Sequence, residues 1–169
     1  MKTSWIRAAT VALIALPHPA LADEAGFLRS LRGAWSGTGT VTLRIGSSPL
    51  NVFCDFKTNT AGTSLAMRGS CRGLVVVHRT VSADIQATGP RYSGTYLGPS
   101  GVPSKLSGTR TGNSIALAIR WGREINGDRF ARMTIEKVGG NRLRLRTIDR
   151  DLKTGTDLVT SDIRLSRYR

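Results

Sequence analysis

The sequence predicts an all-β protein: an antiparallel up-and-down barrel of about eight to ten strands behind one short N-terminal helix. Three observations support this fold class. Apolar and polar residues alternate over most of the chain after residue 33. Gly, Asn and Pro interrupt the alternation at short intervals, as turns between strands do. Only one segment has helical spacing, so short connections are expected to join neighbouring antiparallel strands.

Residues 1–22 have the layout of a cleavable export signal. Lys2 and Arg7 supply a positive start, a nine-residue apolar run follows, and residues 20–22 form a small-residue cleavage site. The apolar run is shorter than the roughly 20 residues that a membrane span needs. We therefore expect removal of this signal peptide rather than a retained amphipathic helix. Residues 23–169 should then form a single barrel domain, periplasmic or secreted, in a Gram-negative envelope.

The elements follow from local spacing. Residues 23–32 predict a helix, because Phe27, Leu28 and Leu31 lie on one face and Gly33 ends the run. A longer turn is expected over 122–128. The predicted strands cover or centre on residues 38–45, 50–57, 65–71, 73–85, 91–97, 105–110, 114–121, 131–135, 143–147 and 159–165.

Cys54 and Cys71 are the only cysteines. In an exported protein two cysteines predict a disulfide, against the alternatives of two free thiols or half a metal site. A hairpin that pairs them also places Phe56 opposite Gly69, where the aromatic ring covers the gap that the glycine leaves. The only histidine after the leader is His78, so a metal site would lack ligands.

No residue pattern predicts catalysis, and we expect that the protein is not an enzyme. The chain has no Gly-x-Ser-x-Gly elbow, no His-Glu-x-x-His pair and no phosphate-binding loop. Asp149, Asp151 and Asp157 form the only close acidic cluster. A calcium loop would need a bidentate Glu that this cluster lacks, so a polar hairpin loop is favoured. Neither a metal nor a cofactor is predicted.

Arginines late in the chain form a candidate anion-binding face. Its members are Arg120, Arg132, Arg142, Arg144, Arg146 and Arg164. Guanidinium groups bind carboxylate and phosphate bidentately, so this face suits an anionic glycan, lipid or protein of the envelope. The alternative is a solvated outer face interspersed with Asp149, Asp162 and Glu136. Nucleic acid is not expected, because of export and because no aromatic residues lie among these arginines for base stacking.

The order of a helix, Gly33-x-Trp35 and then antiparallel strands resembles the calycin superfamily, which includes the lipocalins. The resemblance implies that Trp35 closes one end of the barrel. It also implies that a basic side chain of the last strand, Arg164 or Arg167, packs over the indole ring. The alternative is that Trp35 is an ordinary core aromatic.

Two further resemblances concern the same opening. Gly33-x-Trp35-x-Gly37-x-Gly39 is similar to the start of nitrobindin-type haem barrels, whose iron ligand is a His near the C-terminal end. Here no His follows residue 78, so no haem is expected. The two cysteines after a Gly-x-Trp strand also resemble those of periplasmic inhibitor barrels.

We therefore expect a non-enzymatic, lipocalin-like binding protein, with a small apolar or lipid ligand. The alternative is an envelope inhibitor or scaffold that acts through the loop at 98–104 or through the candidate anion-binding face. The side chains expected to point inward describe a packed core, which is favoured, or the lining of a pocket. They are Leu50, Val52, Phe56, Met67, Val75, Ile115, Leu117, Ile119, Met133 and Ile135.

Overall fold

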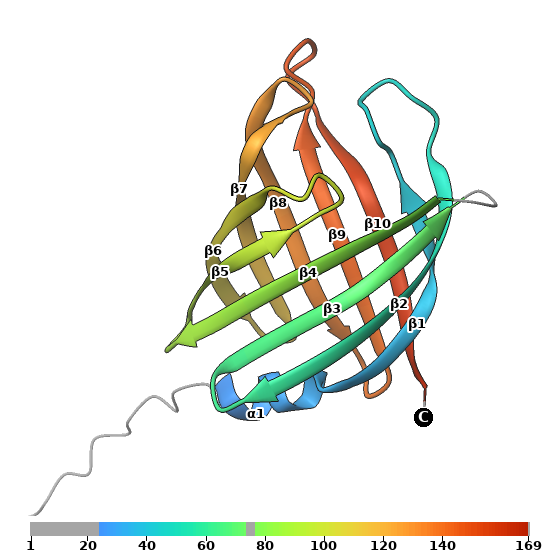
Figure 1. Ribbon diagram of the computed structural model, residues 1–169. Helices are drawn as coiled ribbons and strands as arrows, with labels where there is room; N and C mark the ends of the chain where they lie inside the picture. Colours follow the sequence, from blue (N-terminus) through green and yellow to red (C-terminus); the bar gives the residue numbers. More distant parts are fainter. Residues whose placement is uncertain (1–23, 74–76, 169) are drawn as a thin grey trace, which may run out of the picture.

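The computed structural model describes residues 24–73 and 77–168, which form a closed antiparallel barrel with a short helix at one end (Figure 1). Each strand pairs with its neighbours in sequence, and β1 pairs with β10 to close the barrel. The all-β, up-and-down prediction is therefore confirmed, with ten strands. The elements are α1 (Glu24–Leu31), β1 (Gly33–Val41), β2 (Leu50–Ala61), β3 (Ser64–Gly73), β4 (Val77–Thr88), β5 (Arg91–Leu97), β6 (Pro103–Thr111), β7 (Ser114–Ile125), β8 (Asp128–Val138), β9 (Arg142–Arg150) and β10 (Asp157–Tyr168).

Two predictions concern residues that the structure does not describe. The export signal at residues 1–22 and the inward position of Val75 both lie outside the described ranges. Within those ranges, the one helix is too short and too polar to cross a membrane.

Two predicted boundaries are wrong. The first strand begins at Gly33 and ends at Val41, whereas alternation placed it at 38–45. Gly37 and Gly39 occupy two inward positions of β1, so the inward face carries too few side chains there for the alternation to be read. The turn expected over 122–128 is shorter and lies at residues 126–127, because β7 continues to Ile125 through an irregularity in its pairing with β8.

The hairpin of β2 and β3 has the predicted register. Cys54 pairs with Cys71, and the two sulfurs form a disulfide. Phe56 pairs with Gly69, and a Cβ added at Gly69 would lie 2.3 Å from Phe56 Cδ1. The ring therefore fills the space that any larger residue at this position would need.

Glycines on the inner face allow the strands to bend sharply. A Cβ on Gly37 would lie 2.0 Å from the carbonyl oxygen of Arg164 on β10. A Cβ on Gly108 would lie 1.9 Å from the carbonyl oxygen of Ala116 on β7. No side chain fits at such distances, so these two positions bring neighbouring backbones together and curve the wall of the barrel.

Helix α1 closes one end of the barrel, at the bottom in Figure 1. Leu28 and Leu31 of the helix are fully buried, as is Trp35. The Trp35 Nε1 donates hydrogen bonds to the Leu31 carbonyl oxygen and the Thr58 hydroxyl, both at 3.1 Å. Arg167 lies over the indole ring, 4.1 Å from its centroid. Arg167 also donates to the Ser30 carbonyl oxygen at 2.8 Å, so β10 holds the helix in place.

A buried ion pair fixes the start of the same helix. The Glu24 carboxylate accepts hydrogen bonds from Arg110 Nε at 2.7 Å and Arg110 Nη2 at 3.0 Å. The Tyr92 hydroxyl donates to the same carboxylate. Burial, helped by Glu24, raises the pKa of Tyr92 well above its usual value, so its hydroxyl remains a donor. Glu24, Tyr92 and Arg110, called the latch below, join α1 to β5 and β6.

Candidate binding site

Inward side chains of the barrel are less completely buried toward the end opposite α1. Along β7, the inward residues Ile115, Leu117 and Ile119 are 0–2% exposed, whereas Trp121 at the far end is half-buried. The same change occurs along β9, from buried Leu143 to half-buried Leu145. Leu145 points inward by register, and Trp121 contacts the inward ring of Tyr96. Their partial exposure indicates that this end, called the open end below, is packed less tightly than the end beside α1, although Asp149 further along β9 is buried again.

The lining of this open end is mainly apolar. Tyr96 and Trp121 make an edge-to-face contact with ring centroids 6.0 Å apart. Burial raises the pKa of Tyr96 to about 12, so its hydroxyl is neutral at physiological pH. The half-buried apolar side chains on inward positions are Val52, Cys71, Val81, Tyr96, Trp121, Met133 and Leu145.

A buried polar cluster lies at the same end. Asp149 is only 4% exposed and accepts a hydrogen bond from the Thr160 hydroxyl through Oδ2. An irregularity in the β9–β10 pairing between Val159 and Ser161 places Thr160 beside this carboxylate. Burial raises the pKa of Asp149, and the hydrogen bond from Thr160 is the largest opposing effect.

Two buried polar atoms of this cluster have no hydrogen-bond partner in the described part of the chain. They are Asp149 Oδ1 and Trp121 Nε1. A hydrogen bond from the Trp121 indole also lowers the pKa of Asp149, so the two groups lie next to each other at about hydrogen-bond distance. Leaving a buried donor or acceptor unpaired costs about 1–3 kcal/mol, and this contact offsets part of that cost.

The loop at 42–49 crosses the rim beside this cluster. The Ile45 backbone N–H donates to Asn126 Oδ1 at 3.1 Å, and the Thr42 N–H donates to the Thr160 carbonyl oxygen at 2.7 Å. Asn126 occupies the left-handed region with φ 56°, which asparagine tolerates better than most residues. Asn126 also lowers the pKa of Asp149, so the loop, the β7–β8 turn and the cluster are linked.

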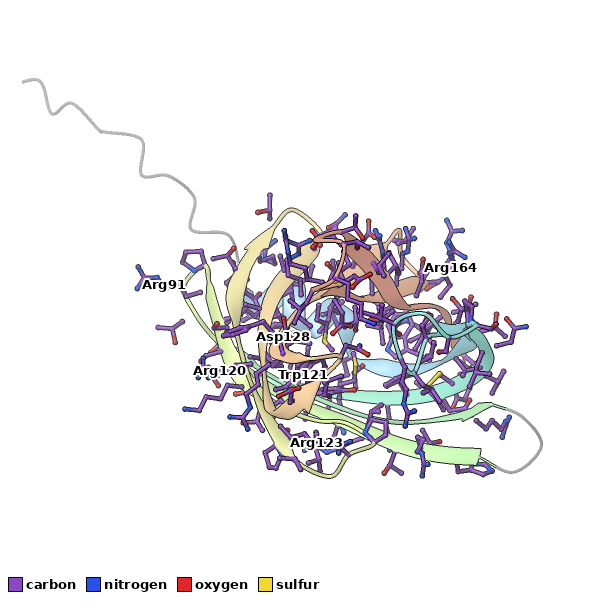
Figure 2. The ribbon with its side chains drawn as sticks, turned by 90° about the horizontal axis from the view of Figure 1, so that it is seen from above. Arg91, Arg120, Trp121, Arg123, Asp128 and Arg164 are labelled. Carbon is purple, nitrogen blue, oxygen red and sulfur yellow. A yellow bond between two sulfur atoms is a disulfide. The ribbon has the colours of Figure 1, made fainter. Side chains whose placement is uncertain are left out.

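The candidate anion-binding face lies on the outside of the barrel, and acids neutralise part of it. Figure 2, seen from above, places Arg120 and Arg164 at the outer rim, whereas Trp121 lies inside the outline. Arg144 makes a bidentate pair with Asp162 at 2.9 and 2.6 Å. Arg164 lies 3.7 Å from the same carboxylate.

The other predicted members of the face are dispersed. Arg132 pairs with Asp157 at 2.5 Å, and Arg120 stacks on Phe130 at 5.3 Å from the ring centroid. Arg146 pairs in register with Asp162, whereas Arg142 pairs with Ser166. The structure therefore gathers Arg144, Arg146 and Arg164 around one aspartate and leaves the others on separate patches.

Of the two arginines offered for the place over Trp35, Arg167 occupies it, whereas Arg164 points outward from β10 with a side chain that is 72% exposed. Asp149, which the alternative interpretation placed on the outer face, instead shares the inward parity of Leu143 on β9. Asp151, by contrast, accepts a hydrogen bond from the Lys153 N–H at 2.9 Å, as in the polar hairpin loop favoured above. Among residues 24–73 and 77–168, no three metal-ligating side chains gather.

Sequence reasoning missed the polar cluster as a site. Asp149 could have been found, because it continues the alternation of Leu143, Leu145 and Thr147. Thr160 could not, because the pairing irregularity before Ser161 breaks the parity of β10.

Comparison with known proteins supports the barrel fold but identifies no function. No protein-family model matches the chain, and no curated protein matches it. Among solved structures, the chain is similar to the crystal structure of Rv2717c from M. tuberculosis, with 18% sequence identity and a TM-score of 0.64. The similarity covers 88% of this chain and 99% of that chain. At this identity the likeness establishes only that the two proteins share the barrel fold.

Proposed function

We propose that this protein is a non-enzymatic, calycin-like binding barrel of the bacterial envelope that takes one small apolar molecule through its open end. The change in burial along the inward faces is the observation that carries the proposal. A barrel sealed at one end by α1 and open at the other, with an apolar lining, has the form of a ligand cup. The Cys54–Cys71 disulfide supports an oxidising compartment outside the cytoplasm.

The test is to fill the open end. In Met133→Trp, a large ring would occupy the interior between Leu117 and Thr147, the register partners of Met133 on β7 and β9. Its control is Ala118→Trp, which adds the same ring to an exposed outer position on β7. We expect the wild type and the control to bind one equivalent of an apolar anilinonaphthalene probe, and Met133→Trp to bind it at least tenfold more weakly. Equal affinity in all three proteins would contradict the proposal.

Native mass spectrometry provides a second measurement. Protein purified from its own host should carry an extra mass that organic solvent extracts. A bare protein mass, together with no probe binding, would favour a packed interior.

A surface function is the second candidate, and one observation favours it. A cleft of about 450 Å³ lies between β4 and the β5–β6 loop, and His78, Arg79 and residues 97–99 contribute to its lining. An inhibitor or scaffold could hold a partner there through the loop. The double variant Pro99→Ser, Gly101→Ser should then lose a partner that stays bound to the wild type at high salt. A partner held equally by both proteins would exclude this loop.

A further inference from the structure

A groove crosses the outer wall of the barrel over β1, β2 and β3. Its hollow measures about 590 Å³ and is lined by residues 38–40, 51–53 and 72–73 together with Arg164 of β10. On β2 the inward positions are those of Cys54 and Phe56, so the odd-numbered residues point outward. The groove is therefore separate from the barrel interior. The outward side chains that line it are Thr38, Thr40, Asn51, Phe53, Arg72 and Arg164.

Two exposed arginines lie on opposite sides of this groove. Their side chains are 55% exposed in Arg72 and 72% exposed in Arg164. Neighbouring strands lie about 4.8 Å apart, so the three spacings from β10 to β3 separate the two backbones by about 14 Å along the wall. The Arg72 guanidinium lies over the Phe53 ring, 4.5 Å from its centroid. One register row joins the two sides, through Arg164, Thr38, Phe53 and Arg72.

Neither guanidinium group is taken up by an acid of the described chain. Arg164 lies 3.7 Å from Asp162 Oδ2, and Arg72 lies 4.0 Å from Asp55 Oδ2. Both distances are too long for a hydrogen bond. The Asp162 carboxylate already accepts two hydrogen bonds from Arg144. No acidic residue is among the described residues that line the groove, so the lining is cationic.

The side chains between the two arginines indicate which kind of anion fits. Thr38 and Thr40 offer hydroxyl groups and Asn51 offers an amide, so the floor forms hydrogen bonds without carrying charge. A linear glycan with acidic sugars matches this order, because its anionic groups pair with guanidinium and its hydroxyls pair with the floor. An anionic lipid matches it less well, because Phe53 is the only outward apolar side chain of the lining and covers little of an acyl chain.

We infer that the outer groove over β1, β2 and β3 is a binding site for a linear acidic glycan, in which Arg72 and Arg164 pair with anionic groups of two different sugars. This inference does not rest on the proposed function, because the groove lies outside the barrel. Of the candidate anion-binding face, Arg164 alone lines the groove, and its counterpart across the groove is Arg72 of β3.

The test is isothermal titration calorimetry of the purified protein at an ionic strength of about 0.15 M. The probe is hexagalacturonate, a linear glycan with a carboxylate on each sugar. Maltohexaose is the neutral glycan of the same length, and polyphosphate is a chain of charges without sugars. We expect hexagalacturonate to bind at least tenfold more tightly than the other two, because it alone supplies both carboxylates and hydroxyls.

Three variants assign the binding to the groove. Arg72→Gln and Arg164→Gln should each weaken hexagalacturonate binding at least tenfold, because each removes a charge-assisted contact. The matched control is Arg91→Gln, which removes the same charge from an exposed residue that lies across the barrel from Arg164 in Figure 2. This control should change the affinity less than twofold. Circular dichroism would verify folding, and if one groove variant fails to fold, the other variant and the probe series still decide.

Several results would overturn the inference. Hexagalacturonate does not bind, polyphosphate binds as tightly, or all three arginine variants weaken binding equally. The last two results would mean that net positive charge alone attracts the probe. Met133→Trp distinguishes this site from the proposed interior site, because it should weaken only the apolar probe. Loss of hexagalacturonate binding in a folded Met133→Trp would place the glycan in the interior and would also overturn the assignment.

The failure of one proposal leaves the other standing. If hexagalacturonate binds as expected and the apolar probe does not bind, the proposed function fails while the groove assignment holds. If the apolar probe binds and hexagalacturonate does not, the groove assignment fails alone.

Discussion

Removal of the Glu24 carboxylate should destabilise the closed end of the barrel. The side chains of Glu24 and Arg110 are only 7% and 10% exposed, so their ion pair is buried. In Glu24→Ala, the Arg110 guanidinium would remain at this site without its counter-charge. Breaking one partner of a buried pair costs about 3–5 kcal/mol, because the remaining charge has lost its solvation.

The measurement is urea unfolding followed by circular dichroism, with thermal melting as a second readout. For a domain of this size, each kcal/mol lowers the melting temperature by about 2–4 °C, so a fall of roughly 6–20 °C is expected. Trp35 fluorescence should report the same transition, because Trp35 contacts the end of α1 through its hydrogen bond to Leu31.

Two comparisons make this prediction specific to the latch. The double variant Glu24→Ala, Arg110→Met removes both charges and should recover most of the lost stability, since no unpaired ion remains. Asp84→Ala breaks the pair with Arg68, whose partners are 60% and 52% exposed, and should cost no more than about 1 kcal/mol. The reasoning is refuted if Glu24→Ala costs as little as Asp84→Ala, or if the double variant is no more stable than Glu24→Ala.

Three further predictions concern the disulfide and two aspartates. Replacing Cys54 and Cys71 by serine should cost about 3 kcal/mol in urea unfolding, given their sequence separation of 17; a loss below 1 kcal/mol would contradict the loop-entropy argument. The hydrogen bond from Arg144 lowers the pKa of Asp162, so this carboxylate stabilises the fold above about pH 4 and loses that effect as the pH falls through its lowered pKa. The difference in unfolding free energy between the wild type and Asp162→Asn should therefore shrink as the pH falls over that range. Burial raises the pKa of Asp149, so this carboxylate changes the free energy of unfolding in the opposite direction. The protein should become more stable as the pH falls through the raised pKa towards about 4, and Asp149→Asn should remove this gain. Unfolding free energies measured between about pH 3 and pH 7 check both aspartates, and parallel profiles of the wild type and the two variants would refute both signs.

Much of the fold could be predicted because strand pairing follows local rules. Period-two alternation and turn residues indicate where strands lie, and short connections leave few topologies other than a meander. The β2–β3 register was predictable because the cysteines and the Phe56–Gly69 pair agree on it. The start of β1 was not, because glycines on its inward face carry no side chain to alternate.

The site was less predictable because it depends on contacts between strands far apart in sequence. Local parity indicates that Trp121 and Asp149 point inward, but not that the two side chains lie next to each other in one buried cluster. From the sequence alone, the outward arginines are likewise expected to form one continuous face. Their actual partners, such as Asp162 for Arg144, depend on which strands pair.

The order of residues alone was sufficient for the fold class, the short N-terminal helix and the cysteine pairing, because each is encoded by spacing along a few neighbouring residues. The folded chain was needed for the choice of Arg167 over Arg164, the buried latch at Glu24 and the buried cluster of Trp121 and Asp149. These features arise from barrel closure and from irregular pairing in β7 and β10, which bring together side chains that are distant in the sequence. The alternation of apolar and polar residues within a strand does not encode such contacts.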